Sequence, residues 1–154
     1  MIARLDAVLD RLAAHAAAPV PTSLTDPDPT TGERWTAGQV WGHISEIVPY
    51  WLAGARRIVE APPGEPVEIG RTLDDPTRLA GIVRGTQVAV PVLFDETRAA
   101  IGEARRFIAG LTPADLAREV RHPRYGVMSL AAFLERFIVA HLEEHAAQLD
   151  GLRS

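Results

Sequence analysis

Residues 130–150 read LAAFLERFIVAHLEEHAAQLD, and this stretch decides the fold that the sequence predicts. Ser129 precedes it as a helix N-cap, and Gly151 follows it as a stop signal. Apolar residues recur at helical spacing through the first half, and two histidines continue the same face in the second half. The shared face holds Leu130, Phe133, Leu134, Phe137, His141, His145 and Gln148. We therefore predict one long helix whose inward stripe changes from apolar side chains to imidazole.

His141 and His145 stand four residues apart on this helix. Four residues advance about 400° around a helix axis and about 6 Å along it, so the two side chains project from adjacent turns of one face. Neighbouring helices pack about 8–10 Å apart, axis to axis, so an inward histidine on a second helix can reach the pair. His43 is the remaining histidine that lies in the middle of a predicted helix, on its core face.

The helix that carries His43 begins at Thr36, where Gln39 completes a capping-box pattern. Its apolar face comprises Val40, His43, Ile44, Ile47, Trp51, Ala55 and Ile58. Pro49 removes a backbone donor and crowds the preceding turn, so we expect a kink one to two turns after His43. Pro62, Pro63 and Gly64 end the element.

Two further apolar periodicities, over residues 2 to about 17 and about 91 to 110, predict the remaining long helices. Together the four segments favour an all-α fold, a four-helix bundle in a single domain over residues 1–154. Residues 19–33 are rich in Pro, Thr, Asp and Gly and predict a long loop after the first helix. Such loops often cover or shape a site.

The connections between the later helices are less regular. Residues 62 to about 88 predict a second long loop, with one or two helical turns over 77–83. Thr112 and Pro113 predict the start of a short helix that reaches about residue 118. Residues 119–127 are expected to be extended or looped.

The sequence has no cysteine, so any metal must be bound through nitrogen and oxygen. Three neutral imidazoles from His43, His141 and His145 would leave positions open for a water or a substrate, as in a catalytic divalent site. Zinc, nickel, iron(II) and cobalt all accept such ligands. The alternative is that His141 and His145 are cations near a helix C-terminus, or core histidines with satisfied hydrogen bonds.

The other candidate residues have simpler interpretations. His15, at a helix edge, and His122, in a loop, are treated as structural. Glu46, Glu143 and Glu144 lie within a turn of the proposed ligands and could hydrogen-bond them or act as a general base, but solvated carboxylates are the favoured interpretation. The aromatic residues of the second helix, Trp35, Trp41, Tyr50 and Trp51, are interpreted as core and boundary residues, with a pocket-lining role as the alternative.

Composition limits the classes of partner. The chain is 47% hydrophobic and 23% charged, which is typical of a globular protein. Its net charge of −4 and its lack of clustered cations argue against nucleic acid. Its apolar runs are too short to span a bilayer, and residues 1–6 lack a secretory signal. We expect a cytoplasmic protein that acts on a small molecule, with a homodimer as a possible assembly.

Two stretches of this sequence resemble a known superfamily. Residues 35–43, WTAGQVWGH, and residues 141–149, HLEEHAAQL, are similar to the DinB-like metal-binding four-helix bundles, which also include mycothiol-dependent maleylpyruvate isomerases and bacillithiol S-transferases. The resemblance covers nearly the whole chain and implies that His43, His141 and His145 bind the metal. In the isomerase branch a glutamate takes the place of His141, so the chain resembles the three-histidine DinB type instead. The isomerases also carry a C-terminal domain, whereas the given sequence ends four residues after Asp150.

The resemblance and the three histidines lead to one expected function and two alternatives. The expected function is a metal-dependent thiol S-transferase, in which a zinc, nickel or iron ion lowers the pKa of a low-molecular-weight thiol such as mycothiol for attack on a small electrophile. The first alternative is hydrolysis of a small molecule by metal-activated water. The second is a metal-binding bundle without catalytic activity that acts in a stress response.

Overall fold

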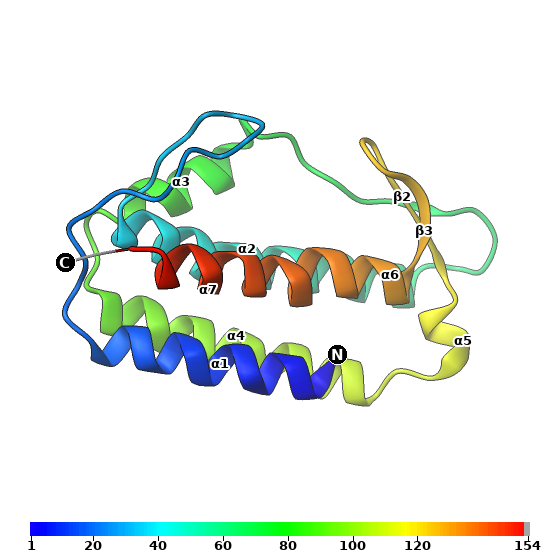
Figure 1. Ribbon diagram of the computed structural model, residues 1–154. Helices are drawn as coiled ribbons and strands as arrows, with labels where there is room; N and C mark the ends of the chain where they lie inside the picture. Colours follow the sequence, from blue (N-terminus) through cyan, green and yellow to red (C-terminus); the bar gives the residue numbers. More distant parts are fainter. Residues whose placement is uncertain (153–154) are drawn as a thin grey trace.

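The computed structural model describes residues 1–152. Its long helices are α1 (Ile2–Ala17), α2 (Ala37–Glu60), α4 (Val90–Ala109) and a continuous helical segment made of α6 (Leu130–Leu134), η1 (Glu135–Ala140) and α7 (His141–Asp150). Figure 1 shows α1 beside α4 in one layer, and α2 beside the α6 to α7 segment in the other. The all-α four-helix bundle that the sequence predicts is therefore confirmed.

The residues between these layers form the hydrophobic core. The apolar faces predicted for α2 and for the last helical segment are buried together, with Ile44, Ile58, Phe133 and Leu134 at 0% exposure. Burial of each such side chain contributes about 1.5–3 kcal/mol, so these faces fix how the helices pack. The α2 helix begins with the predicted capping box, in which the Thr36 hydroxyl accepts from the Gln39 amide.

Pro49 lies inside α2, which continues from Ala37 to Glu60 without a break. The ring removes one backbone donor, but tertiary packing of the buried face on both sides of it holds the helix together. The proline therefore does not end the helix. The kink expected after His43 stays a prediction.

The last helical segment differs from a uniform α-helix. Residues Glu135–Ala140 wind as a π-helix, in which each amide bonds to the carbonyl five residues back instead of four. The wider turn rotates everything that follows relative to an uninterrupted α-helix. It comes directly before His141, so it sets the direction in which the α7 histidines project.

The connections contain more regular structure than the sequence predicts. The second long loop holds α3 (Pro76–Arg84), which is a nine-residue helix capped by Asp75. Within the described residues, β1 (Val67–Glu68) pairs in parallel with β2 (Glu119–His122), and β2 pairs antiparallel with β3 (Gly126–Ser129). The short helix α5 (Pro113–Leu116) begins at Thr112, as predicted. The helical turns expected over residues 77–83 are present as α3, whereas β1 in the same connection was not predicted, because a two-residue strand carries no periodicity.

These connections cover one face of α2 and α7. The long loop after α1 has no helix or strand over residues 19–36, as predicted, and it passes over one end of α2 beside α3. The β2–β3 hairpin rises over the other end (Figure 1). The proposed histidines lie on the face of the bundle between them.

The contact between α2 and α3 depends on glycine. A Cβ atom built on Gly42 would lie 2.3 Å from the Gly81 carbonyl oxygen, and one built on Gly38 would lie 2.3 Å from that of Gly85. The two backbones can approach this closely only because the side chains are absent. The α3 helix is thereby held directly over the turn of α2 that bears His43. Among the described residues, no helix is long and apolar enough to cross a membrane.

Candidate metal centre

The structure brings the three predicted histidines together. His43 projects from α2, and His141 and His145 project from adjacent turns of α7. The Nε2 atom of His141 lies 3.3 Å from Nε2 of His43 and 3.0 Å from Nε2 of His145. One ligand atom from each residue falls within 4.8 Å of the other two. These atoms could hold a metal ion.

The tautomer of His145 leaves a lone pair facing the cluster. Its Nδ1 lies 2.8 Å from the Gln148 side-chain oxygen, and because an amide oxygen only accepts hydrogen bonds, Nδ1 must donate. In a neutral imidazole the Nε2 atom is then unprotonated, and this atom points at His141. A carbonyl that fixes the far nitrogen of a histidine is the usual support of a metal ligand.

The spacing of the nitrogens fits a small divalent cation. Metal–nitrogen bonds of about 2.0–2.1 Å in tetrahedral geometry place two ligand nitrogens about 3.3 Å apart. The observed separations of 3.0 and 3.3 Å are close to this value. Hydrogen bonds explain the arrangement less well, because His141 Nε2 can donate to only one of its two neighbours. The residues present therefore fit a metal.

All three imidazoles are held neutral. Burial lowers the pKa of His145 to about 4, and the hydrogen bond to Gln148 offsets this only in part. Burial, followed by the nearby histidines, lowers the pKa of His43 well below its ordinary value, and the same causes act on His141. Metal ions bind neutral imidazole, so the site is ready for a cation at neutral pH.

Glu46 is not the solvated carboxylate that the sequence suggests. Both of its oxygens accept hydrogen bonds from Arg71, at 2.6 and 2.9 Å. Its Oε2 atom lies 3.9 Å from Nδ1 of His43, a buried nitrogen with no hydrogen-bond partner within the described residues. Arg71 therefore holds Glu46 next to the far side of a proposed ligand, a contact that the α2 sequence by itself does not reveal.

The two glutamates between the paired histidines differ in position. Glu143 turns away from the cluster and binds Arg4 of α1 with both oxygens. The Glu144 side chain is 73% exposed, with Oε2 3.9 Å from Nδ1 of His141. Of the two, Glu144 is the carboxylate that can exchange protons with solvent beside the site.

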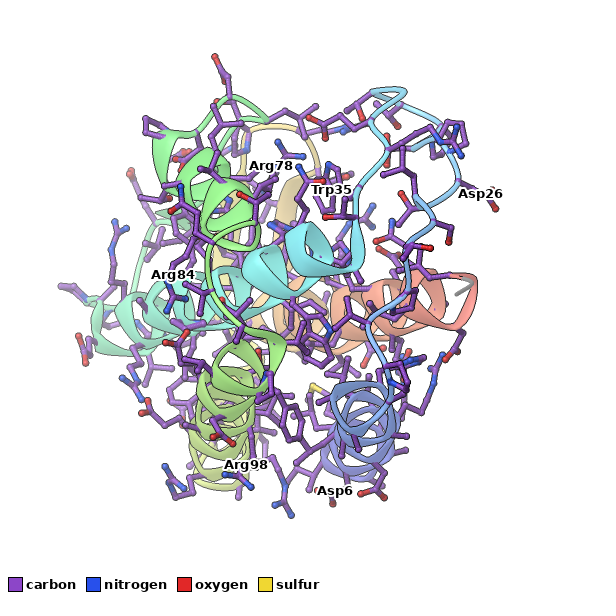
Figure 2. All side chains as sticks on the ribbon, turned by 90° about the vertical axis from the view of Figure 1, so that its left-hand side faces the viewer. Asp6, Asp26, Trp35, Arg78, Arg84 and Arg98 are labelled. Carbon is purple, nitrogen blue, oxygen red and sulfur yellow. The ribbon has the colours of Figure 1, made fainter. Side chains whose placement is uncertain are left out.

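Aromatic residues shield the histidines. Trp35 stacks on His145 with ring centroids 6.0 Å apart and meets His43 edge-on at 5.2 Å. Arg78 of α3 lies over the Trp35 ring at 5.5 Å, and Figure 2 shows the two side chains next to each other between α3 and the long loop. Trp41 and Trp51 are buried in the core, as expected, and Trp51 also lines a cavity. The pocket-lining alternative therefore holds for Trp51, and also for Trp35, which lines a second cavity.

A cavity of about 840 Å³ opens beside the cluster, within the size range of small-molecule sites. His43 and His141 line it together with α3, the hairpin and η1. Its other lining residues include Trp51, Arg71, Arg78, His122, Arg124, Tyr125, Arg136, Phe137 and Glu144. A smaller, more polar cavity of about 330 Å³ adjoins it, and the long loop supplies Thr25, Asp28, Thr30, Thr31 and Glu33 to its wall.

The remaining two histidines lie outside the cluster, one between two helices and the other in the wall of the larger cavity. His15 binds Asp150 at 2.6 Å between α1 and α7, which agrees with a structural role. His122 is 4% exposed on β2 and stacks on Phe137 in the wall of the larger cavity. Its place in the cavity was missed because an irregular segment of sequence does not show which way its residues face.

The fold and the cluster define a class of protein, a four-helix bundle with a cluster of three histidines, two of which line a cavity. Comparison with known families gives the family within that class. The profile of the DinB superfamily matches residues 2–149, and the chain belongs to that superfamily. No curated protein matches the sequence significantly.

Solved structures share this fold at low sequence identity. YfiT from Bacillus subtilis, described as a probable metal-dependent hydrolase with an unusual four-helix bundle topology, is 17% identical, with a TM-score of 0.73 over 97% of this chain and 81% of its own. A mycothiol-dependent maleylpyruvate isomerase is 11% identical, with a TM-score of 0.68 over 98% of this chain and 59% of its own. An uncharacterised protein from Clostridium difficile 630 is 11% identical in sequence, with a TM-score of 0.66 over 97% of this chain and 91% of its own.

Proposed function

We propose that the protein is a divalent-metal-dependent thiol S-transferase, with His43, His141 and His145 as the metal ligands. The observation that carries the proposal is the convergence of three neutral imidazoles, within 4.8 Å of one another, beside a cavity of about 840 Å³. A bound zinc, nickel or iron ion would supply a Lewis-acidic position at which a thiol loses its proton near neutral pH. The resemblance to mycothiol-dependent enzymes supports mycothiol as the thiol.

The protein's own residues then have separable roles. Gln148 fixes His145 through Nδ1, and Arg71 holds Glu46 beside His43. The exposed carboxylate of Glu144 lies beside Nδ1 of His141, where it would support that ligand from the side away from the cluster. The overall reaction converts R–SH and R′–X into R–S–R′, H⁺ and X⁻, so a C–S bond forms as the C–X bond breaks.

Metal analysis of the purified full-length chain is the first test. We expect about one divalent ion per chain in the wild type, little metal after His43→Ala, and wild-type content after His15→Ala, because His15 binds Asp150 outside the cluster. Conjugation of 1-chloro-2,4-dinitrobenzene should then require both the metal and an added thiol. A metal-free wild-type protein whose stability does not change on His43→Ala would refute the proposal.

A hydrolase is the second candidate, supported by the fold shared with YfiT, a probable metal-dependent hydrolase. The same three ligands would serve, with water in place of the thiol. Ester or amide turnover that depends on metal but not on thiol would favour this function. Metal-dependent stability with no turnover in either assay would favour a metal-binding bundle without catalytic activity. The cytoplasmic location and the homodimer stay predictions.

A further inference from the structure

The cavity wall formed by the hairpin and η1 has two arginines without a counter-ion. Arg136 lies over the Tyr125 ring at 3.8 Å and Arg124 over the same ring at 5.5 Å. Within residues 1–152 neither guanidinium forms an ion pair, whereas Arg71 binds Glu46 and Arg78 binds Glu33. Two cations thus face the cavity with their charge unneutralised.

Two ring nitrogens that can donate hydrogen bonds belong to residues lining the same cavity. The Nε1–H group of Trp51 is buried and has no partner among the described residues. The Nδ1 atom of His122 accepts from the Arg124 amide at 3.1 Å, so the ring proton is on Nε2 and is available to donate. The His122 group can donate to a ligand oxygen in the cavity, whereas the Trp51 group is closed off from the surface.

Aromatic rings that pack against one another line the cavity beside these donors. Phe137 stacks on His122 with centroids 4.8 Å apart and planes 16° from parallel. Trp51 lies 4.6 Å from Phe137, centroid to centroid. The rings give the cavity an apolar aromatic lining against which a planar conjugated molecule can pack. The cavity therefore combines an aromatic lining with positive charge and a hydrogen-bond donor.

We propose that this wall binds an organic anion, a small molecule with a carboxylate on a flat aromatic or unsaturated body. The carboxylate binds Arg136 and Arg124, and the body lies against Phe137 and Trp51. Arginine suits a carboxylate because its planar fork donates two parallel hydrogen bonds. This inference rests on the proposed function in one respect, that the anion is the electrophilic substrate. The binding itself requires neither a thiol nor turnover.

Calorimetric titration of the full-length chain with 2-naphthoate, and with the uncharged 2-naphthamide of the same shape, tests the inference. We expect naphthoate to bind at least tenfold more tightly than naphthamide, both in the purified protein and after removal of metal by a chelator. Arg136→Gln should weaken naphthoate binding about tenfold, or about 1.4 kcal/mol, and leave naphthamide binding unchanged. Arg124→Gln should do the same to a smaller extent, and it replaces Arg136→Gln if that variant does not fold.

Arg98→Gln is the matched control, because Arg98 is an exposed arginine on α4, at the opposite end of the molecule from Arg78 in Figure 2. It should leave both affinities unchanged. Equal binding of the two probes, or equal loss of both on Arg136→Gln, would overturn the inference. Loss of the naphthoate preference on chelation would place the carboxylate at the histidines and would also overturn it. Failure of the transferase and hydrolase assays would not affect these results, so the two proposals can fail separately.

Discussion

Replacement of Gly42 by alanine tests whether the α2–α3 contact holds the site together. The new Cβ would lie 2.3 Å from the Gly81 carbonyl oxygen and 2.6 Å from the Gly85 amide nitrogen. Ordinary contact begins near 3.4 Å, so the shortfall is about 1 Å. Both obstacles are backbone atoms, so no side-chain rotation relieves them, and α3 must move as a unit.

The expected cost follows from this geometry. Overpacking of a filled contact costs about 1–3 kcal/mol, and alanine regains about 0.5–1 kcal/mol over glycine through its helix propensity. We therefore expect a net loss of about 1–2 kcal/mol in the free energy of unfolding. With an m-value of about 1–3 kcal/mol/M, the urea midpoint should fall by roughly 0.5–1 M. Movement of α3 also displaces Arg78, so naphthoate and metal affinities should change together with stability.

Gly102→Ala in α4 is the matched control. The nearest atom to its new Cβ is the Arg106 Nη1 atom at 3.6 Å, so nothing has to move. This variant should gain up to about 1 kcal/mol from helix propensity. Urea unfolding of both variants and the wild type measures whether the free energy of unfolding falls in Gly42→Ala and rises in Gly102→Ala. A Gly42→Ala protein as stable as the wild type, or more stable, would refute the reasoning that the close backbone approach excludes a side chain.

Two further predictions concern single hydrogen bonds. Gln148→Leu removes the acceptor that fixes His145, so the affinity for metal should fall about 10- to 100-fold. Competition with a chromogenic chelator measures this affinity. Gln87→Leu, on the exposed surface, is the control and should leave the affinity unchanged. The hydrogen bond from Arg11 holds the pKa of Asp150 below 3.8, so the folded state binds its proton less readily than the unfolded state does. Its contribution is present above pH 3.8 and is lost as the pH falls through the folded pKa. Asp150→Asn should therefore reduce stability by at most about 1 kcal/mol at pH 7, because the pair is exposed, and by progressively less as the pH falls below 3.8.

The main helices and the proposed ligands could be predicted because each depends on local periodicity. The spacing of His141 and His145 places them on one face whatever the rest of the chain does, and the apolar stripe around His43 turns it toward the core. Hydrophobic burial then brings the two faces together, which is why all three imidazoles meet. The identity of the metal and of the substrate does not follow from that periodicity.

The irregular parts could not be predicted to the same extent. The hairpin strands have four residues each, too few for a clear alternating pattern, and the π-helical turn at Glu135–Ala140 has no sequence signal of its own. Arg71 and Arg136 look like surface residues in the sequence. Only the packing of their segments over α2 and α7 turns them toward the cavity.

The sequence by itself therefore determined the bundle, the boundaries of its main helices and the residues that form the histidine cluster. These follow from side-chain period and helix caps, which act within a few turns of chain. The tertiary structure alone decided that Arg71 holds Glu46 beside His43 and that Arg124 and Arg136 line one cavity with Phe137 and Trp51. The direction in which these side chains point, and the partners that they bind, depend on contacts between segments far apart in the chain. Only the packing of α3 and the hairpin against the bundle specifies those contacts.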